Sequence, residues 1–189
     1  MRRRDASSRG APRSAANSQR MSTNPGHASK ASETRTLKVG DPAPDFTLTS
    51  HTGEQFHLAG ARGGNVVVAF FPAAFSSVCT KELCTFRDSL ARLNQAQAQV
   101  YGISVDTFFT LKAFHDQQGY NFPLLSDFNK QAIRDYGVFN EDMIGLKGIA
   151  KRATFVIDKD GIVRHREVLD DARNEPNYDA VFRTLASLS

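Results

Sequence analysis

The chain has 189 residues, 40% of them hydrophobic and 10% aromatic, so it is long enough for one folded domain with a buried core. It contains no apolar run of the length that spans a bilayer, and its basic start leads into no apolar segment, so we expect neither membrane contact nor a secretory signal. We therefore expect a cytoplasmic protein whose two cysteines are reactive or inert thiols and not a permanent structural disulfide.

The first 36 residues differ from the rest in charge and composition. They hold eight Arg or Lys residues against two acidic residues and lack periodic apolar positions, so we expect residues 1–36 to be a disordered basic extension. Three interpretations stay open: a dispensable extension with Met21 as the true start, an organelle transit peptide, or an arm that binds nucleic acid or anionic lipid. Because the whole chain carries +4, residues 37–189 are slightly acidic, and we expect no nucleic-acid binding by this domain.

The folded region opens with strand signals and then a helix signal. Alternating apolar residues in 46–57, with a glycine turn between them, predict an N-terminal β-hairpin or two edge strands. The run 65–71 (NVVVAFF) consists mostly of β-branched and aromatic residues, which is typical of a strand covered on both faces, and Pro72 ends it. Apolar residues at helical spacing then predict a helix over 81–95.

The second half of the chain continues this alternation and ends in a hairpin and a helix. The predicted elements are a strand from Gln99, a helix from Thr107, a strand from Phe122, a helix over 129–138, strands from Arg152 and from Ile162, and a helix over 177–188. The turn sequence KDG between the last two strands is typical of a β-hairpin. This order predicts an α/β fold with a central mixed β-sheet flanked by helices.

Both cysteines lie in the segment FFPAAFSSVCTKELC, directly after the buried strand. Cys79 falls at the expected start of a helix, where free backbone N–H groups and the helix dipole favour an anion. Ser76 can donate a hydroxyl hydrogen bond to a thiolate at this position, and Pro72 can pin the loop that shelters it. Cys79 is therefore expected to be the activated thiol.

Cys84 lies five residues after Cys79, which on an intact helix means about 7.5 Å along the axis and about 140° around it. A disulfide needs Cα atoms within roughly 7 Å and side chains that face each other. The spacing therefore indicates either two independent thiols or a helix that unwinds during turnover.

The spacing Pro72-x-x-x-Ser76-x-x-Cys79 resembles the peroxiredoxin signature, in which Pro and then Thr or Ser precede the peroxidatic cysteine. The run CTKELC is similar to the bacterioferritin-comigratory or peroxiredoxin Q subgroup, which carries a resolving cysteine five residues later, and FFPAAF and FRDSL resemble the AhpE-like branch. The run KRATFVIDKDGIV is similar to the region that holds the family's active-site arginine, here Arg152. The resemblance extends from VGDPAPDF to the last helix and implies a thioredoxin-like fold over residues 37–189.

The resemblance also implies a thiol-dependent peroxidase. We expect no cofactor, and no metal because two cysteines and five scattered histidines offer no cluster of zinc ligands. Cys79 would attack hydrogen peroxide or an organic hydroperoxide. Arg152 would stabilise the thiolate and the negative charge that builds on oxygen in the transition state, and Glu82 would orient Arg152 through a bidentate pair. Cys84 would resolve the sulfenic acid as a disulfide, which thioredoxin or a similar dithiol would reduce. The preferred peroxide, the reductant and the choice between monomer and homodimer stay open.

Other interpretations stay open on the residues alone. Two cysteines near an amphipathic helix are often buried small hydrophobes, and Ser76 could serve only as a helix N-cap. A general disulfide oxidoreductase would normally carry Cys-x-x-Cys, which is absent. A redox-sensing module or one that protects unfolded client proteins would turn over peroxide slowly, and its client protection would survive Cys79→Ser. A Cys-His hydrolase would need His115 or His165 within hydrogen-bond reach of Cys79.

Overall fold

The structure is a computed structural model that describes residues 36–188, so all but the last residue of the predicted basic extension lies outside the described residues. The strands are β1 (Thr47–Ser50), β2 (Gln55–His57), β3 (Asn65–Phe70), β4 (Ala98–Ser104), β5 (Leu124–Ser126), β6 (Phe139–Asn140), β7 (Ile149–Ala150), β8 (Ala153–Ile157) and β9 (Val163–Val168). The helices are α1 (Ser77–Asp88), α2 (Leu90–Gln95), α3 (Phe108–Gln118), α4 (Ala132–Asp135) and α5 (Tyr178–Ala186), with a 3-10 turn η1 (Leu58–Ala61).

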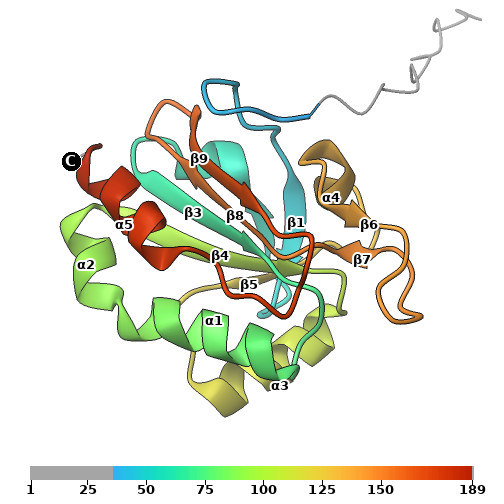
Figure 1. Cartoon of the computed structure of the whole chain (residues 1–189). Helices are drawn as coiled ribbons and strands as arrows, with labels where there is room; N and C mark the ends of the chain where they lie inside the picture. The colour runs from blue at the N-terminus through green and yellow to red at the C-terminus, as the bar shows by residue number, and fades with distance from the viewer. Residues whose placement is uncertain (1–35, 189) are drawn as a thin grey trace, which may run out of the picture. The chain divides into compact units, whose positions relative to one another are not determined.

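Seven strands form one mixed sheet in the order β2-β1-β5-β4-β3-β8-β9 (Figure 1). β3, β4 and β5 run parallel, whereas β8 is antiparallel to β3 and β9 is antiparallel to β8. The predicted α/β fold with a central mixed sheet is therefore confirmed. The N-terminal hairpin is present as β1 and β2, but β1 also pairs with β5, so of these two strands it is β2 that lies at the sheet edge.

The sheet has an apolar core on each face, and β3 contributes to both. Val66, Val68 and Phe70 belong to one core, and Val67 and Ala69 belong to the other, as the alternation of side chains along a strand requires. All six residues of β3 are buried, because β4 and β8 pair with its two edges and an apolar core covers each of its faces. β3 is thus the rigid centre from which the next segment starts.

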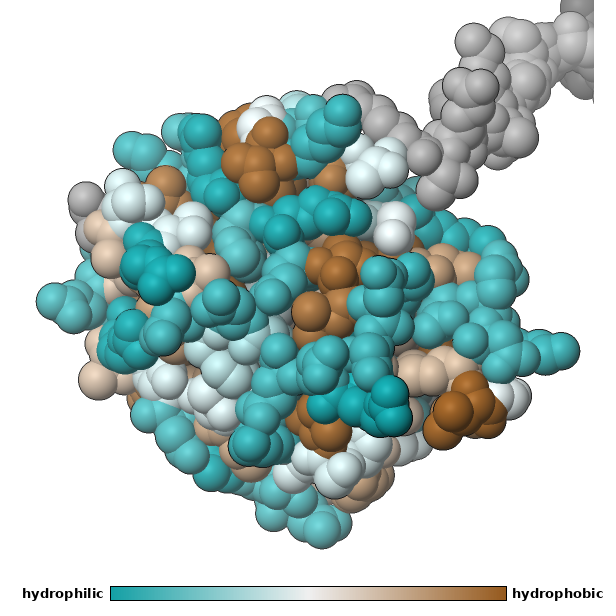
Figure 2. All heavy atoms as spheres, viewed as in Figure 1, coloured by the Kyte–Doolittle hydropathy of each residue, from teal (hydrophilic) through white to brown (hydrophobic). Residues whose placement is uncertain are grey.

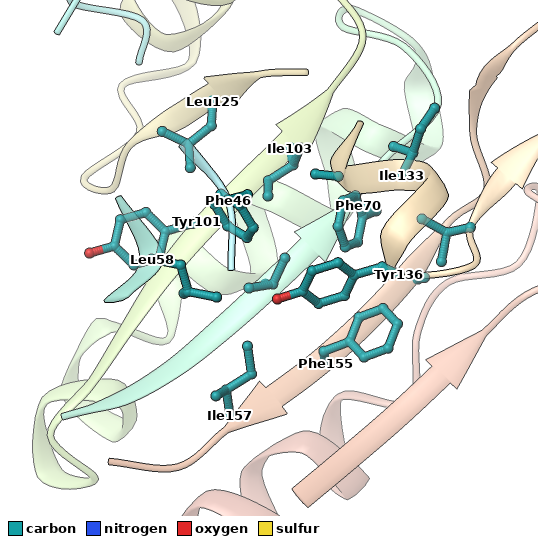
Figure 3. Packing of buried hydrophobic residues seen from close by; sticks show 14 of the residues in the cluster. Phe46, Leu58, Phe70, Tyr101, Ile103, Leu125, Ile133, Tyr136, Phe155 and Ile157 are labelled. Atoms are coloured by element: carbon teal, nitrogen blue, oxygen red, sulfur yellow. The ribbon is translucent and has the colours of Figure 1, made fainter. Parts of the chain in front are cut away.

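Different helices cover the two faces. On one face the ring of Tyr136, which follows α4, lies 5.2 Å from Phe70 and 5.1 Å from Phe155, with neighbours from β4, β5 and η1 around it (Figure 3). On the other face the core includes Leu83 and Phe86 of α1 together with apolar residues of α2, α3 and α5. None of the helices in the described part of the chain is both long and apolar enough to cross a membrane.

The helix predicted over 81–95 is wrong in two respects. It begins at Ser77, because Ser76 has extended backbone angles (φ −72°, ψ 148°) and forms the N-cap. It also breaks at Ser89, whose backbone N–H donates to the carbonyl of Phe86 three residues back, and α2 starts directly after Ser89 as a separate helix. Apolar spacing alone does not reveal this change in the backbone hydrogen bonds. The short pair β6 and β7 was also missed.

Candidate active site

Strand pairing brings Arg152 to the end of β3. In the antiparallel register of β3 and β8, Phe70 lies opposite Ala153, so Arg152 follows directly at the carboxyl end of β3. The chain leaves β3 at this same end, passes through Pro72 and enters α1 at Ser77. The pairing therefore joins the start of α1 to a residue far along the sequence.

Cys79 lies in the first turn of α1 and is completely buried. Its sulfur accepts a hydrogen bond from Nη2 of Arg152 at 3.3 Å. The rest of its surroundings are apolar, since it belongs to the same core cluster as Phe71 and Leu83. The thiol is thus enclosed by apolar side chains on most sides and faces a guanidinium on one side. In an apolar setting the attraction between a thiolate and a guanidinium is stronger than in water.

Arg152 is 1% exposed and divides its donors among three partners. Nε and Nη2 donate to the carbonyl of Ala172 at 3.2 and 3.0 Å, Nη2 also donates to Cys79, and Nη1 pairs with Oε2 of Glu82. Burial acts to lower the pKa of Arg152, but the charges of Glu82 and Cys79 outweigh it and raise the pKa overall. The guanidinium therefore keeps its charge at neutral pH although it is buried.

Glu82 lies one turn after Cys79 on α1 and is fully buried. The predicted bidentate pair with Arg152 is wrong, because only Oε2 meets the guanidinium while Oε1 has no hydrogen-bond partner among the described residues. The other donors of Arg152 are already directed at Ala172 and Cys79. Burial raises the pKa of Glu82 to about 7, against the opposing effect of Arg152.

Ser76 and the loop before it are arranged differently from the expectation. The hydroxyl of Ser76 donates to the carbonyl of Ala73 at 3.1 Å, so its one proton is not directed at Cys79, and the side chain makes no capping bond to α1. Phe75 has a φ of 64°, in the left-handed region that is uncommon for residues other than glycine. Its ring lies 4.8 Å from the ring of Phe114, which holds the loop against α3.

Asp106 is a residue of this site that the sequence reasoning missed. Its Oδ2 accepts hydrogen bonds from the backbone N–H of Ala74 and from the hydroxyl of Ser104, both at 2.8 Å. This carboxylate ties the loop between β3 and α1 to the end of β4. The available signal was its position directly after a strand parallel to β3, because the carboxyl ends of neighbouring parallel strands meet at one edge of the sheet.

A mostly apolar cavity of about 280 Å³ lies beside Arg152. Its lining includes Pro72, Val78, Ile144 and Leu146, with Arg152 as the buried charged group. Ile144 and Leu146 belong to the loop between β6 and β7, and Ile144 is 93% exposed. Figure 2 shows an apolar cluster at the surface over this loop. The cavity thus offers a ligand apolar surface and two cationic side chains, the buried Arg152 and the exposed Arg173, which is paired with Asp171.

The second thiol, Cys84, is half-buried in the same unbroken helix, and both cysteines are free. His115, one of the two histidines considered for a hydrolase, stacks on His51 with ring centroids 3.8 Å apart, and its Nδ1 lies 3.4 Å from Asp116. Within residues 36–188, no group of three or more His, Cys, Asp or Glu side chains could hold a metal.

A buried thiol that meets a buried arginine at the end of the central strand of a mixed α/β sheet defines a thiol-based redox protein. The protein-family model described as the AhpC/TSA family matches residues 39–166. Alkyl hydroperoxide reductase E of Mycobacterium tuberculosis is 43% identical over 135 residues, which cover 70% of this chain and 86% of that protein. Peroxiredoxin Bcp of Escherichia coli K12 is 38% identical over 152 residues, which cover 79% of this chain and 96% of that protein.

Solved structures agree with the sequence relatives. The crystal structure of peroxidoxin BcpB from Mycobacterium tuberculosis matches with a TM-score of 0.73 at 31% identity, over 81% of this chain and 99% of that chain. This match also confirms the predicted thioredoxin-like architecture. The chain belongs to the AhpC/TSA family, the peroxiredoxins, which are peroxidase enzymes.

Proposed function

We propose that this chain reduces hydrogen peroxide and organic hydroperoxides through Cys79 as the peroxidatic cysteine. The observation that carries the proposal is the 3.3 Å contact between Nη2 of Arg152 and the buried sulfur of Cys79. The thiolate attacks the terminal oxygen of the hydroperoxide, so that an S–O bond forms and the O–O bond breaks. The leaving oxygen takes up a proton and departs as water or an alcohol, and Cys79 is left as a sulfenic acid.

The neighbouring groups have separate roles in this step. Arg152 stabilises the thiolate and then the negative charge that develops on the leaving oxygen. Glu82 fixes the guanidinium by its single ion pair. The backbone N–H of Cys79 lies in the first turn of α1, where helix geometry leaves it without an intrahelical partner, so it is available to a bound oxygen. The Ser76 hydroxyl joins it after a rotation away from Ala73, and Pro72 shelters the site.

Cys84 is proposed as the resolving cysteine. Both thiols lie in α1, so the disulfide forms only after the first turns of the helix unwind. Leu83 lies between them and is fully buried, and exposing a leucine side chain costs about 1.5–3 kcal/mol. The open form is therefore a minor population that becomes trapped once the disulfide forms. Thioredoxin or a similar dithiol then reduces the disulfide by exchange, in a reducing compartment such as the cytoplasm.

The apolar lining of the cavity favours organic hydroperoxides among the substrates. Ile144 and Leu146 offer surface to an alkyl group, and hydrogen peroxide has nothing to bury against them. One relative is named alkyl hydroperoxide reductase E, which supports the same substrate class.

Two variants test the proposal. Cys79→Ser is expected to abolish peroxide consumption, and turnover close to that of the native chain would contradict the assignment. Cys84→Ser is expected to reduce one equivalent of peroxide and then stop in the presence of thioredoxin and its reductase. Unchanged steady-state turnover by Cys84→Ser would show that Cys84 is not the resolving thiol. Mass spectrometry after one equivalent of peroxide, with and without thiol blocking, identifies the sulfenate and the disulfide directly.

A further inference from the structure

Two acidic groups of this site share one buried cation. Nη2 of Arg152 donates to the sulfur of Cys79 at 3.3 Å, and Nη1 of the same guanidinium meets Oε2 of Glu82. Each of the three side chains is at most 1% exposed. With both acids ionised, one positive charge would face two negative charges, a net charge of −1 in the interior. Because an uncompensated buried charge is costly, the site favours a state in which Cys79 and Glu82 hold one proton between them.

The two carboxyl oxygens of Glu82 have different surroundings. Oε2 accepts from the guanidinium, whereas Oε1 is buried and has no hydrogen-bond partner among the described residues. A buried carboxylate oxygen without a donor is destabilised, because no water solvates its charge. A protonated carboxyl removes that charge and still accepts through its other oxygen. The geometry therefore suits a carboxylic acid that carries its proton on Oε1 and is held by Arg152 through Oε2.

The protonation of Glu82 depends on the charge of Cys79. Burial is the largest of the causes that raise the pKa of Glu82 to about 7, and Arg152 opposes it. A thiolate on Cys79 places a further negative charge beside the same guanidinium, and a like charge disfavours ionisation of its neighbour. Glu82 therefore holds its proton more firmly beside a thiolate than beside a neutral sulfur.

The remaining titratable groups around Glu82 do not take over this role. Glu175, which precedes α5, is paired with Lys81 at 2.5 Å, and this bond lowers the pKa of Glu175, so it stays ionised near neutral pH. Its charge and that of Glu167 on β9 raise the pKa of Glu82. Burial raises the pKa of Tyr178 on α5, which therefore stays neutral.

We infer that Glu82 stores the proton that Cys79 gives up when its thiolate forms, and returns it when the thiolate is consumed. The inference rests on the proposed function of Cys79 as the peroxidatic thiol, and it names the source of the proton that the leaving oxygen takes up. In the resting enzyme the S–H bond of Cys79 is broken and an O–H bond is formed on Oε1 of Glu82. The thiolate then has the guanidinium as its counter-ion, and Glu82 is neutral.

Reaction with a hydroperoxide reverses this transfer. The thiolate attacks the terminal oxygen, so the S–O bond forms, the O–O bond breaks, and hydroxide or an alkoxide leaves. The sulfenic acid on Cys79 is neutral, so the O–H bond of Glu82 now breaks and its proton converts the leaving oxygen to water or an alcohol. Arg152 faces one negative charge before and after the reaction. Oε2 accepts from it in both states, which keeps the guanidinium in place.

The first test counts protons during oxidation. Chains in a Cys84→Ser background, which stops at the sulfenic acid, are mixed with one equivalent of hydrogen peroxide at pH 8 in weak buffer with an indicator dye. This pH lies above the pKa of about 7, so Glu82 ionises once Cys79 is neutral. The chain with Glu82 should form the sulfenic acid without net proton uptake. Glu82→Gln should take up about one proton per sulfenic acid formed, because solvent must neutralise the hydroxide.

The second test observes the carboxyl group directly. Infrared difference spectra of the same chains should show loss of the C=O band of a protonated carboxyl when Cys79 is oxidised at pH 8. Glu82→Gln should show no such loss. The matched control is Glu175→Gln, which removes a neighbouring carboxylate that is already ionised and should behave like the chain with both glutamates in the two tests. Thiolate absorbance before mixing confirms that Cys79 starts ionised.

The outcomes separate this inference from the proposed function. Oxidation of Cys79 with uptake of about one proton by the chain that has Glu82, or without loss of the carboxyl band, overturns the inference and leaves the proposed function standing. Absence of thiolate absorbance at pH 8 also overturns it. A Cys79 that hydrogen peroxide does not oxidise ends the proposed function itself. These results come from the chain with Glu82, so they decide the question even where Glu82→Gln does not fold.

Discussion

Nη2 of Arg152 lies 3.3 Å from the sulfur of Cys79, although 73 residues of sequence separate the two side chains. Both are buried, and the guanidinium also borders the cavity through which a substrate would approach. In the proposed reaction, a single side chain thus faces the nucleophile on one side and the incoming peroxide on the other. In the proposed reaction, the same guanidinium therefore stabilises both the thiolate and the negative charge that develops on oxygen as the O–O bond breaks.

Replacing Arg152 should weaken both the stabilisation of the Cys79 thiolate and the stabilisation of the leaving oxygen. Arg152→Ala is expected to lower the rate constant for peroxide reduction by about 10²–10³, the cost of losing one well-placed donor to a developing oxyanion. Arg152→Lys keeps a charge but loses the fork, and should fall between the alanine variant and the native chain. The chain has no tryptophan, so the rate is measured by competition against a haem peroxidase for hydrogen peroxide.

The matched control is Arg164→Ala, which removes a partly exposed arginine whose ion pair is with Asp158 on the last hairpin. Its rate should equal that of the native chain. Ultraviolet absorbance of the thiolate at pH 7, measured in a Cys84→Ser background, should fall in Arg152→Ala and stay constant in Arg164→Ala. Equal thiolate absorbance in all three proteins would show that Arg152 does not stabilise the thiolate of Cys79.

Glu82 should make stability depend on pH in a direction opposite to that of an ordinary salt-bridged carboxylate. Its folded pKa of about 7 lies above 4.5, so between these values the folded state holds a proton that the unfolded state has lost. The stabilisation is fully present below about pH 4.5 and is lost as pH rises through about 7. Between pH 5 and 8, the free energy of unfolding of the native protein should fall by on the order of 3 kcal/mol relative to that of Glu82→Gln.

The measurement is urea unfolding at several pH values, with Cys79→Ser in both proteins so that the thiol does not titrate. Glutamine keeps the shape of Glu82 and cannot ionise, so the difference between the two curves isolates this one group. Parallel curves across pH 5–8 would mean that Glu82 is ionised throughout the folded range.

Asp106 should matter to the reaction although it does not touch the thiol. Asp106→Asn weakens the bonds to Ala74 and Ser104, which hold the loop between β3 and α1, and so loosens the start of the helix. We expect peroxide reduction to slow about tenfold, with unfolding easier by about 1–2 kcal/mol. Asp116→Asn, an exposed carboxylate paired with Lys112, is the control for charge alone. A native rate in Asp106→Asn would show that the loop is fixed by other contacts.

Ile144 should contribute to the preference for alkyl hydroperoxides over hydrogen peroxide. Ile144→Ser removes an exposed apolar side chain from the cavity and should raise KM for a long-chain alkyl hydroperoxide several-fold, since each buried methylene contributes about 0.8 kcal/mol. The rate with hydrogen peroxide should stay the same, and this substrate serves as the internal control. A parallel loss with both peroxides would point to a change at Arg152 or Cys79. No change with either would exclude the β6–β7 loop from substrate binding.

Most of the fold followed from local patterns. The valine-rich run of β3 and the alternation of strands and helices after it were enough to predict a mixed sheet, because burial on two faces imposes a recognisable composition. The break at Ser89 was not predictable from apolar spacing, since it is a local change in backbone hydrogen bonding, in which the N–H of Ser89 donates to the carbonyl of Phe86. β6 and β7 are two residues each and carry no period at all.

The site was predictable only in part. Cys79, Arg152 and Glu82 are brought together as expected, since helix spacing and the family resemblance both constrain them. The predicted bidentate pair of Glu82 and Arg152 was wrong, because Nε and Nη2 of Arg152 donate to the carbonyl of Ala172 instead. No pattern of side chains in the sequence reveals such a backbone acceptor. Asp106 was missed for a related reason. It follows β4, and only the packed sheet brings the end of β4 to the loop that leads to Cys79.

Synthesis of the chain on a ribosome proceeds from β3 toward β8, so Cys79 emerges well before Arg152 exists. Until β8 pairs with β3, the nascent thiol has no guanidinium beside it and should behave as an ordinary cysteine toward oxidants. The long sequence separation of the pair thus delays reactivity until most of the polypeptide has been made. The contact between the two side chains can therefore form only after β8 has been made and has paired with β3.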